Sequence, residues 1–237
     1  LCLLLTFVFV TVFSTQPLLA ASDQKTSVAW PEAPLTNSGA ACLMDADTGA
    51  ILFDANMDEQ RYPASITKVM TALLVAENRQ PTDTVTFGEQ AVSESIPGNA
   101  RIDVQLGETI TVEDALHAVL LASANEVCTQ LAIDIAGSVE AFADMMNERA
   151  AALGCTNTHF TNPNGLPDPN HYTTAHDMAL IMQEAIKNET FLRVESDLSY
   201  TIQPTNMTAA PRQLQNHHVM LFQDDPTYGY QGAFAGK

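Results

Sequence analysis

The spacing of hydrophobic and polar residues changes along the chain. Two pairs of segments, one early and one late, show the pattern that predicts strands. Apolar runs at about 39–44 and 50–54 flank turn residues that include Gly49, which predicts a β-hairpin with a loop longer than two residues. After about residue 195, LSYTIQP predicts a strand, and TNMTAAPRQLQNHHVML predicts a loop leading into another strand or short helix. Strand-forming segments therefore lie early and late in the chain.

Between these strands the spacing of apolar residues is helical. The segment 66–76, ITKVMTALLVA, is apolar on nearly every side, which predicts a buried helix rather than an amphipathic one. Pro63 fits the start of that helix, where its missing N–H costs nothing. About a hundred residues of helical pattern follow, with start and stop signals at Thr111 with Asp114, Ser138, Gly154 and Thr174.

The order of hairpin, buried helix, helical block and strands predicts an α+β fold rather than an alternating α/β fold. We expect an antiparallel sheet with flanking helices, in which the first and last strands share one sheet. A mostly helical subdomain, at about 85–190, would be inserted into it.

The first residues, LCLLLTFVFVTVFSTQPLLAAS, begin without Met and contain an apolar run of about 13 residues. That run is too short to span a bilayer comfortably. A proline and small residues follow it, which predicts the rear part of a secretory signal peptide over 1–21, cut after about Ala20 to Ser22. A buried core helix or a membrane anchor is the alternative.

Residues 22–37 are polar and contain prolines, so they predict a linker, and 38–237 then form the folded domain. Cys42, Cys128 and Cys155 remain after such a cut, and their odd number without CxxC spacing argues against a disulfide framework. We expect each to be a small buried apolar residue.

Charge excludes one class of partner. The chain has 28 acidic and 10 basic side chains among 237 residues, a formal net charge of −18. It therefore repels polyanions, and since no segment clusters Lys and Arg, we expect no nucleic-acid partner.

Ser65 and Lys68 stand one helical turn apart at the start of the predicted buried helix. Buried lysines are rare unless they are paired. A serine becomes a strong nucleophile when a neighbour takes its proton, and a lysine can do so only when neutral. Lowering its pKa from about 10.4 to about 7 costs about 4 kcal/mol, so we expect burial and a second lysine nearby.

The same spacing also occurs at Ser22 and Lys25, in the polar linker, where it carries no meaning. Spacing alone therefore leaves a structural alternative open. In that interpretation Ser65 caps the helix and Lys68 lies along the surface.

Two further features add to this pair. Ser123-Ala124-Asn125 interrupts an apolar helical run with two short polar side chains, although a loop whose Asn caps the next helix would give the same pattern. In the ending GYQGAFAGK, a glycine-rich stretch precedes Lys237. Glycine is the residue that lets a backbone come close to a ligand. An arbitrary last residue is the alternative there.

Together these stretches resemble the Ser-x-x-Lys, Ser-x-Asn and Lys-Thr-Gly elements of the penicillin-binding, active-site-serine superfamily. Over about 38–237 the chain looks like the low-molecular-mass serine-type D-alanyl-D-alanine carboxypeptidases. The segments that carry this likeness are MDADTGAILFDAN, GETITVEDALHAVLLASANE, LGCTNTHFTNPNGL and YTTAHDMALI.

The resemblance implies hydrolysis of the terminal D-alanyl-D-alanine bond of peptidoglycan pentapeptides, outside the cytoplasm, with β-lactams as covalent inhibitors and no cofactor. Ser65 would be the acylated nucleophile and Lys68 its base. Ser123 would relay a proton to the leaving D-alanine, and Asn125 would hold the substrate amide and Lys68. Lys237 would supply the second cation and help to bind the terminal carboxylate.

The sequence departs from the family pattern at its end, because the Thr and Gly of the third element do not follow Lys237. In the family, that strand supplies one donor of the oxyanion hole, and loss of one such donor costs roughly 10²–10³ in rate. We therefore expect the chain as written to be inactive and its fold to be truncated. Membrane association would depend on a region beyond it.

Three other functions stay open. A class A-like β-lactamase uses a loop glutamate to activate water, whereas the loop TNPNGLPDPNHY contains none. A zinc peptidase needs three protein ligands, and the six histidines show no HExxH, so we expect no metal. A non-catalytic β-lactam sensor or wall-binding module would be acylated without releasing D-alanine.

Overall fold

The structure is a computed structural model that describes residues 36–222, and the elements below are those of that part of the chain. Its helices are α1 (Lys68–Asn78), α2 (Glu89–Ser93), α3 (Val112–Leu120), α4 (Asn125–Ala136), α5 (Val139–Ala152), α6 (Ala175–Ala185) and α7 (Glu189–Ser196). Its strands are β1 (Ala41–Met44), β2 (Ile51–Ala55), β3 (Thr84–Thr86), β4 (Thr109–Thr111), β5 (Ser199–Ile202) and β6 (Arg212–Gln215). Single 3-10 turns, Ala64–Thr67 and Val219–Leu221, precede α1 and follow β6.

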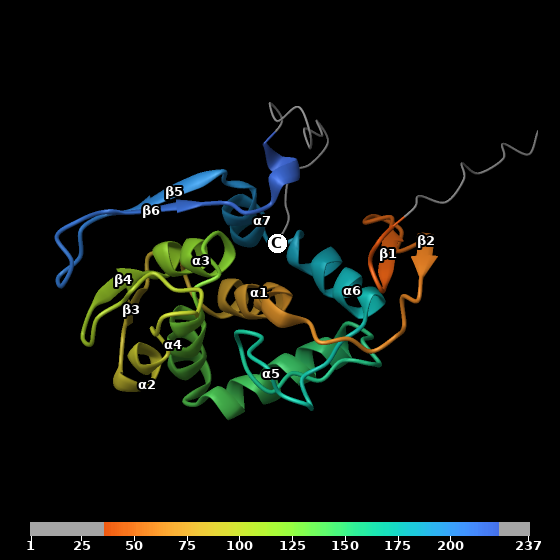
Figure 1. The fold of residues 1–237 in the computed structure, drawn as a ribbon, viewed down its shortest axis with the longest axis horizontal. Coiled ribbons are helices and arrows are strands. Elements are labelled where there is room, and N and C mark those ends of the chain that lie inside the picture. Colours follow the sequence, from red (N-terminus) through yellow and green to blue (C-terminus); the bar gives the residue numbers. More distant parts are fainter. Residues whose placement is uncertain (1–35, 223–237) are drawn as a thin grey trace, which may run out of the picture. The chain divides into compact units, whose positions relative to one another are not determined.

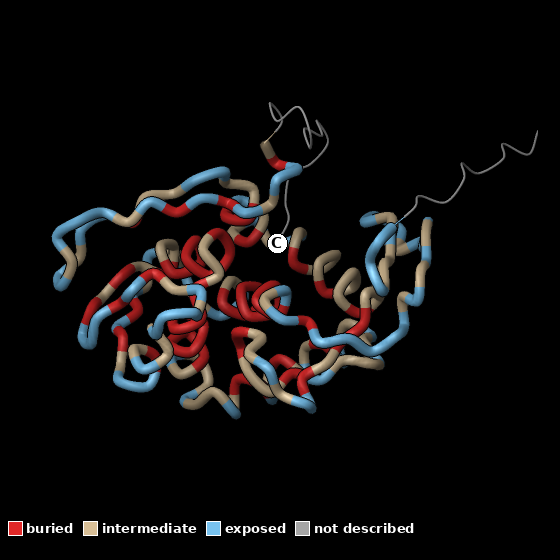
Figure 2. Tube along the Cα trace, viewed as in Figure 1, coloured by how far each residue is buried: buried red, intermediate tan, exposed pale blue. Residues whose placement is uncertain are grey.

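Helix α1 forms the centre of the core, as the all-round apolar pattern predicts. It contacts α3, α4, α5, α6 and α7 (Figure 1). Its residues from Lys68 to Val75 are all buried. Figure 2 shows the same distribution, with buried positions concentrated in α1, α3 and α4 and exposed positions along the hairpins. A helix surrounded in this way can hold a side chain at its N-terminus away from water.

The predicted helix signals fall where the helices begin and end. Thr111 and Asp114 form a capping box at α3, and the hydroxyls of Ser138 and Thr174 accept backbone N–H bonds at α5 and α6. Gly154, with φ of +86°, follows the end of α5 in the left-handed conformation that glycine tolerates best. Local sequence therefore sets the ends of these helices.

The strands pair antiparallel as β1–β2, β3–β4 and β5–β6, in three separate two-stranded sheets. The α+β class and the first hairpin are confirmed, whereas the pair β3–β4 was not predicted. The expectation that the first and last strands share one sheet is wrong for residues 36–222. The first pair, β1–β2, and the last pair, β5–β6, are attached to different helices. Strand β1 packs on α6, and Tyr200 of β5 stacks on His117 of α3 with ring centroids 3.6 Å apart.

Several predictions fall outside the described residues: the signal peptide over 1–21, most of the linker 22–37, and Lys237. Within 36–222, no helix has the length and apolar character needed to cross a bilayer. The three cysteines in that range form no disulfide, but only Cys128 is buried as expected, while Cys42 and Cys155 are half-buried.

Candidate active site

Ser65 and Lys68 lie together where the 3-10 turn passes into α1. The Lys68 side chain is fully buried, with 0% of the residue exposed, and its Nζ lies 3.4 Å from Ser65 Oγ. Neither the 3-10 turn nor α1 has a side-chain cap at its N-terminus. The structural alternative, with Ser65 as a helix cap and Lys68 on the surface, therefore does not describe this pair.

Two amide oxygens hold the Lys68 nitrogen on its other sides. Nζ donates to Asn125 Oδ1 at 2.8 Å and to the backbone oxygen of Asn164 at 2.6 Å. A neutral amine has two N–H donors and one lone pair, and an amide oxygen can only accept. Two donors directed at Asn125 and Asn164 leave the lone pair for the hydroxyl of Ser65, which is the arrangement a base requires.

Burial lowers the pKa of Lys68, because the charged ammonium loses its hydration. Negative charge at Glu126 and Glu94 acts in the opposite direction and favours the protonated form. The second cation that the sequence predicts, Lys237, lies outside the described residues. Within 36–222, desolvation is thus the cause of the lowered pKa.

The Ser123-Ala124-Asn125 stretch is a tight connection between α3 and α4. Ser123 has a φ of +60°, a left-handed conformation that is rare for serine and that marks local strain. Asn125 is the first residue of α4 and directs its side chain to Lys68, so it does not act as the helix cap. Ser123 Oγ is buried and has no hydrogen-bond partner among the described residues, which leaves its hydroxyl available to a ligand.

Sequence reasoning missed the contribution of the loop 161–172. Gly165 has a φ of +83°, and a Cβ there would lie 1.8 Å from the backbone oxygen of Ala64. The loop therefore presses on the residue before Ser65, and only glycine permits that approach. Thr71 Oγ1 also donates to the Pro163 carbonyl at 2.6 Å, which fixes the loop on α1. The residues TNPNGLPDPNHY predicted a turn-rich loop, but nothing local indicated its partner.

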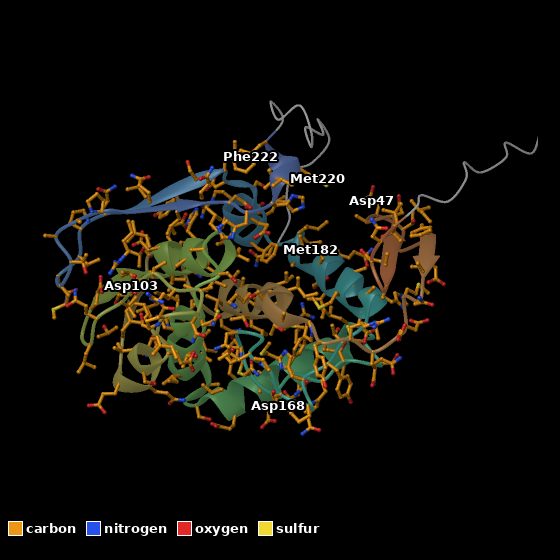
Figure 3. The ribbon with its side chains drawn as sticks, viewed as in Figure 1. Asp47, Asp103, Asp168, Met182, Met220 and Phe222 are labelled. Atoms are coloured by element: carbon orange, nitrogen blue, oxygen red, sulfur yellow. The ribbon has the colours of Figure 1, made fainter. Side chains whose placement is uncertain are left out.

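His171 fixes the far end of this loop. Its Nδ1 accepts from the Thr161 N–H at 3.0 Å, so its Nε2 carries the proton and donates to Thr67 Oγ1 at 2.8 Å. Burial lowers the pKa of His171 to about 4, and the ring is therefore neutral at physiological pH. Asp168, labelled in Figure 3, belongs to the same loop. The histidine serves as a structural link within it.

Two cavities lie beside Ala64 and Ala122, the residues that precede Ser65 and Ser123. One, of about 360 Å³, is lined by Ala64 together with Tyr62, Leu166, Pro167 and Pro169. The other, of about 660 Å³, is lined by Ala122 together with Arg101, Arg212 and His217; Asp103, labelled in Figure 3, also lines it. Among residues 36–222 there is no group of His, Cys, Asp and Glu side chains that could hold a metal ion.

The fold is that of the penicillin-binding proteins and DD-peptidases. Penicillin-binding protein 5 from Haemophilus influenzae superimposes with a TM-score of 0.72 at 33% identity, covering 80% of this chain and 55% of that one. A serine-to-alanine mutant of the Streptomyces K15 DD-transpeptidase superimposes with a TM-score of 0.78 at 26% identity, covering 86% of this chain and 81% of that one.

A sequence model of the D-alanyl-D-alanine carboxypeptidases, peptidase family S11, matches residues 27–227. The chain is 36% identical over 181 residues to D-alanyl-D-alanine carboxypeptidase DacF of Bacillus subtilis, covering 70% of this chain and 46% of the relative. It belongs to the peptidase S11 family. The chain spans about half the length of the curated relatives it matches, since the Haemophilus influenzae DacA is also covered to 46%.

Proposed function

We propose that the protein to which this chain belongs hydrolyses the terminal D-alanyl-D-alanine bond of peptidoglycan stem peptides through an acyl-enzyme on Ser65, and that penicillins acylate the same serine. The observation that carries the proposal is the Lys68 amine, fully buried, held by two oxygen acceptors and facing Ser65 Oγ at 3.4 Å. Membership of the S11 family supplies the reaction class.

In the acylation step, Ser65 Oγ attacks the carbonyl carbon of the penultimate D-alanine while its proton passes to Lys68 Nζ. The carbon–nitrogen bond to the last D-alanine then breaks, and its amine takes a proton that comes from Lys68 by way of the Ser123 hydroxyl. Asn125 keeps the lysine in place and binds the substrate amide. The product is an ester between Ser65 and the shortened peptide.

In the second step, water attacks this ester. Its proton passes to Lys68 and then to Ser65 Oγ as the carbon–oxygen bond breaks, so the enzyme returns to its starting state. Lys237 would bind the terminal carboxylate of the substrate. A cationic site suits an anionic substrate in a protein with a net charge of −18, because the local charge opposes the global one.

The substrate places the activity outside the cytoplasm. We infer that residues 1–21 act as an export signal and 22–37 as a linker, and that 38–237 form the catalytic domain with a helical insertion at about 85–190. Apolar residues followed by a proline and small residues in the first segment support this assignment.

The test, made on the whole protein, is release of D-alanine from a peptide ending in D-Ala-D-Ala, with mass spectrometry of the protein after exposure to a penicillin. We expect stoichiometric acylation at Ser65, loss of both activities in Ser65→Ala and Lys68→Met, and full activity in the control Lys187→Met. Lys187 is a suitable control because it is an exposed lysine, paired with Glu184 at 3.0 Å.

Other outcomes would support other functions. Rapid turnover of penicillin would indicate a β-lactamase, and acylation without release of D-alanine would indicate a sensor. Activity lost to a chelator and restored by zinc would indicate a metal-dependent peptidase. Any of these three results would overturn the proposal.

A further inference from the structure

A carboxylate that the proposed mechanism does not use is linked to Lys68 by hydrogen bonds through one intervening residue. Glu94 follows directly after α2, and its Oε2 accepts from Thr129 Oγ1 of α4 at 2.8 Å and from Asn164 Nδ2 at 3.0 Å. The backbone oxygen of the same Asn164 accepts from Lys68 Nζ at 2.6 Å. Asn164 therefore joins Glu94 to the lysine.

The surroundings make this connection rigid. Thr129 is 0% exposed and Asn164 is 3% exposed, so water does not compete for their hydrogen bonds. Hydrogen bonds to an ionised group are about twice as strong as those between neutral groups. Three elements far apart in sequence, the end of α2, the helix α4 and the loop 161–172, thus meet at one carboxylate.

We propose that Glu94 is a positioning residue for Lys68: its carboxylate fixes Asn164, whose carbonyl orients the lysine amine. The negative charge of the same carboxylate also favours the protonated amine. This inference rests on the proposed function for the work that the amine does. The coupling between Glu94 and Lys68 is a property of the folded chain and can be measured without a substrate.

Few other charged groups face Lys68 within the described residues. These are Glu126 on α4 and Glu94 at the end of α2, while the neutral thiol of Cys128 on α4 donates to the Ala124 carbonyl. Glu126 Oε1 accepts from the Ile102 N–H at 2.7 Å, so the hydrogen bonds of that carboxylate lead away from the lysine. Burial raises the pKa of Glu94, and the bonds from Thr129 and Asn164 together with the charge of Lys68 offset that rise only in part. Of the two carboxylates, only Glu94 is hydrogen-bonded to a residue that also holds Lys68.

Two variants separate the effect of the Glu94 charge from the effect of its hydrogen bonds to Thr129 and Asn164. Glu94→Gln keeps the size of the side chain and removes its charge, whereas Glu94→Asp keeps the charge but is too short to reach both Thr129 and Asn164. Glu89→Gln is the matched control, because Glu89 is an exposed glutamate on α2, the helix that directly precedes Glu94. Its removal costs at most a small interaction with the helix N-terminus.

The first measurement is the titration of Lys68 by NMR in protein labelled with ¹³C at the lysine ε-carbon. The chain has four lysines, Lys25, Lys68, Lys187 and Lys237, so Lys68→Met assigns the signal directly. We expect the pKa of Lys68 to fall in Glu94→Gln and to stay near the wild-type value in Glu94→Asp and Glu89→Gln. An unchanged titration in Glu94→Gln would overturn the inference, whether or not the protein reacts with penicillin.

The second measurement is the rate at which a fluorescent penicillin acylates the whole protein as a function of pH. Glu94→Gln should move the acidic limb of the profile to lower pH, because the amine loses its proton more readily. Glu94→Asp should leave the limb in place and lower the plateau rate about tenfold, because Asn164 loses an anchor. A residue that only supports the fold would lower the thermal midpoint in both variants and leave the limb where it is.

The outcomes also separate this inference from the proposed function. If the whole wild-type protein is not acylated, the proposed function fails, while the NMR titration still decides the coupling. If Glu94→Gln does not fold, Glu94→Asp decides the inference through its plateau rate, and a wild-type plateau in that variant would overturn it.

Discussion

The contact between Gly165 and Ala64 gives the sharpest test of how the loop 161–172 supports the site. A Cβ at Gly165 would lie 1.8 Å from the Ala64 oxygen and 2.4 Å from its carbon, both backbone atoms that cannot rotate away. Gly165→Ala therefore forces the loop to move off the residue that precedes Ser65. Because Asn164 is the adjacent residue, its carbonyl should leave Lys68 with it.

The magnitude follows from two costs. The φ of +83° disfavours any L-residue with a Cβ by about 1–2 kcal/mol. Overpacking adds about 1–3 kcal/mol. Gly137 provides a matched control, since its φ is +86° and no atom lies within 4 Å of a Cβ placed there. Gly137→Ala should show the backbone cost alone.

Thermal unfolding and the acylation rate check this expectation together. At about 2–4 °C per kcal/mol for a domain of this size, Gly165→Ala should unfold about 2–12 °C below Gly137→Ala. Its acylation by penicillin should fall more than about tenfold, because small displacements of reacting groups are costly. Gly137→Ala should keep the wild-type rate. Equal midpoints and equal rates for the two alanine variants would show that the loop does not support Ser65.

Three further predictions concern the hydrogen bonds around the site. Asn125→Asp places a carboxylate where an amide oxygen now lies 2.8 Å from Lys68 Nζ, so the pKa of Lys68 should rise and the acidic limb of the acylation profile should move to higher pH; an unmoved limb would count against the base role. His171 has a pKa of about 4 against an ordinary 6.5, so its contribution to stability is full above about pH 6.5 and is lost as the pH falls towards 4. The thermal midpoint should therefore drop between pH 7 and pH 5 by less in His171→Gln than in the wild type, and equal drops would contradict this. Thr174→Ala removes the bond that its hydroxyl accepts from the Asp177 N–H at 3.0 Å, and urea unfolding should show a loss of about 1 kcal/mol; no loss would mean that the cap is dispensable.

The sequence alone predicted the parts of the fold that depend on near neighbours. Caps at Thr111, Ser138 and Thr174 satisfy N–H groups three residues further on, so a few neighbouring residues suffice to place the starts of these helices. The apolar pattern of 66–76 indicated a helix surrounded by others, and α1 is buried in that way. The spacing of Ser65 and Lys68 placed both on one face of the chain, because that relation is also local.

The tertiary structure decided which distant groups complete the site. The Asn164 carbonyl, the approach of Gly165 to Ala64 and the carboxylate of Glu94 each join segments that lie 70 to 101 residues apart. No periodicity encodes such pairings, since they depend on how helices pack and on which backbone atoms are left to accept a bond. The same holds for the helix on which each hairpin packs, because β1 lies on α6 and Tyr200 of β5 stacks on His117 of α3. Local sequence thus placed a serine beside a lysine, and packing removed the lysine from water, which lowers its pKa towards the neutral form that a base requires.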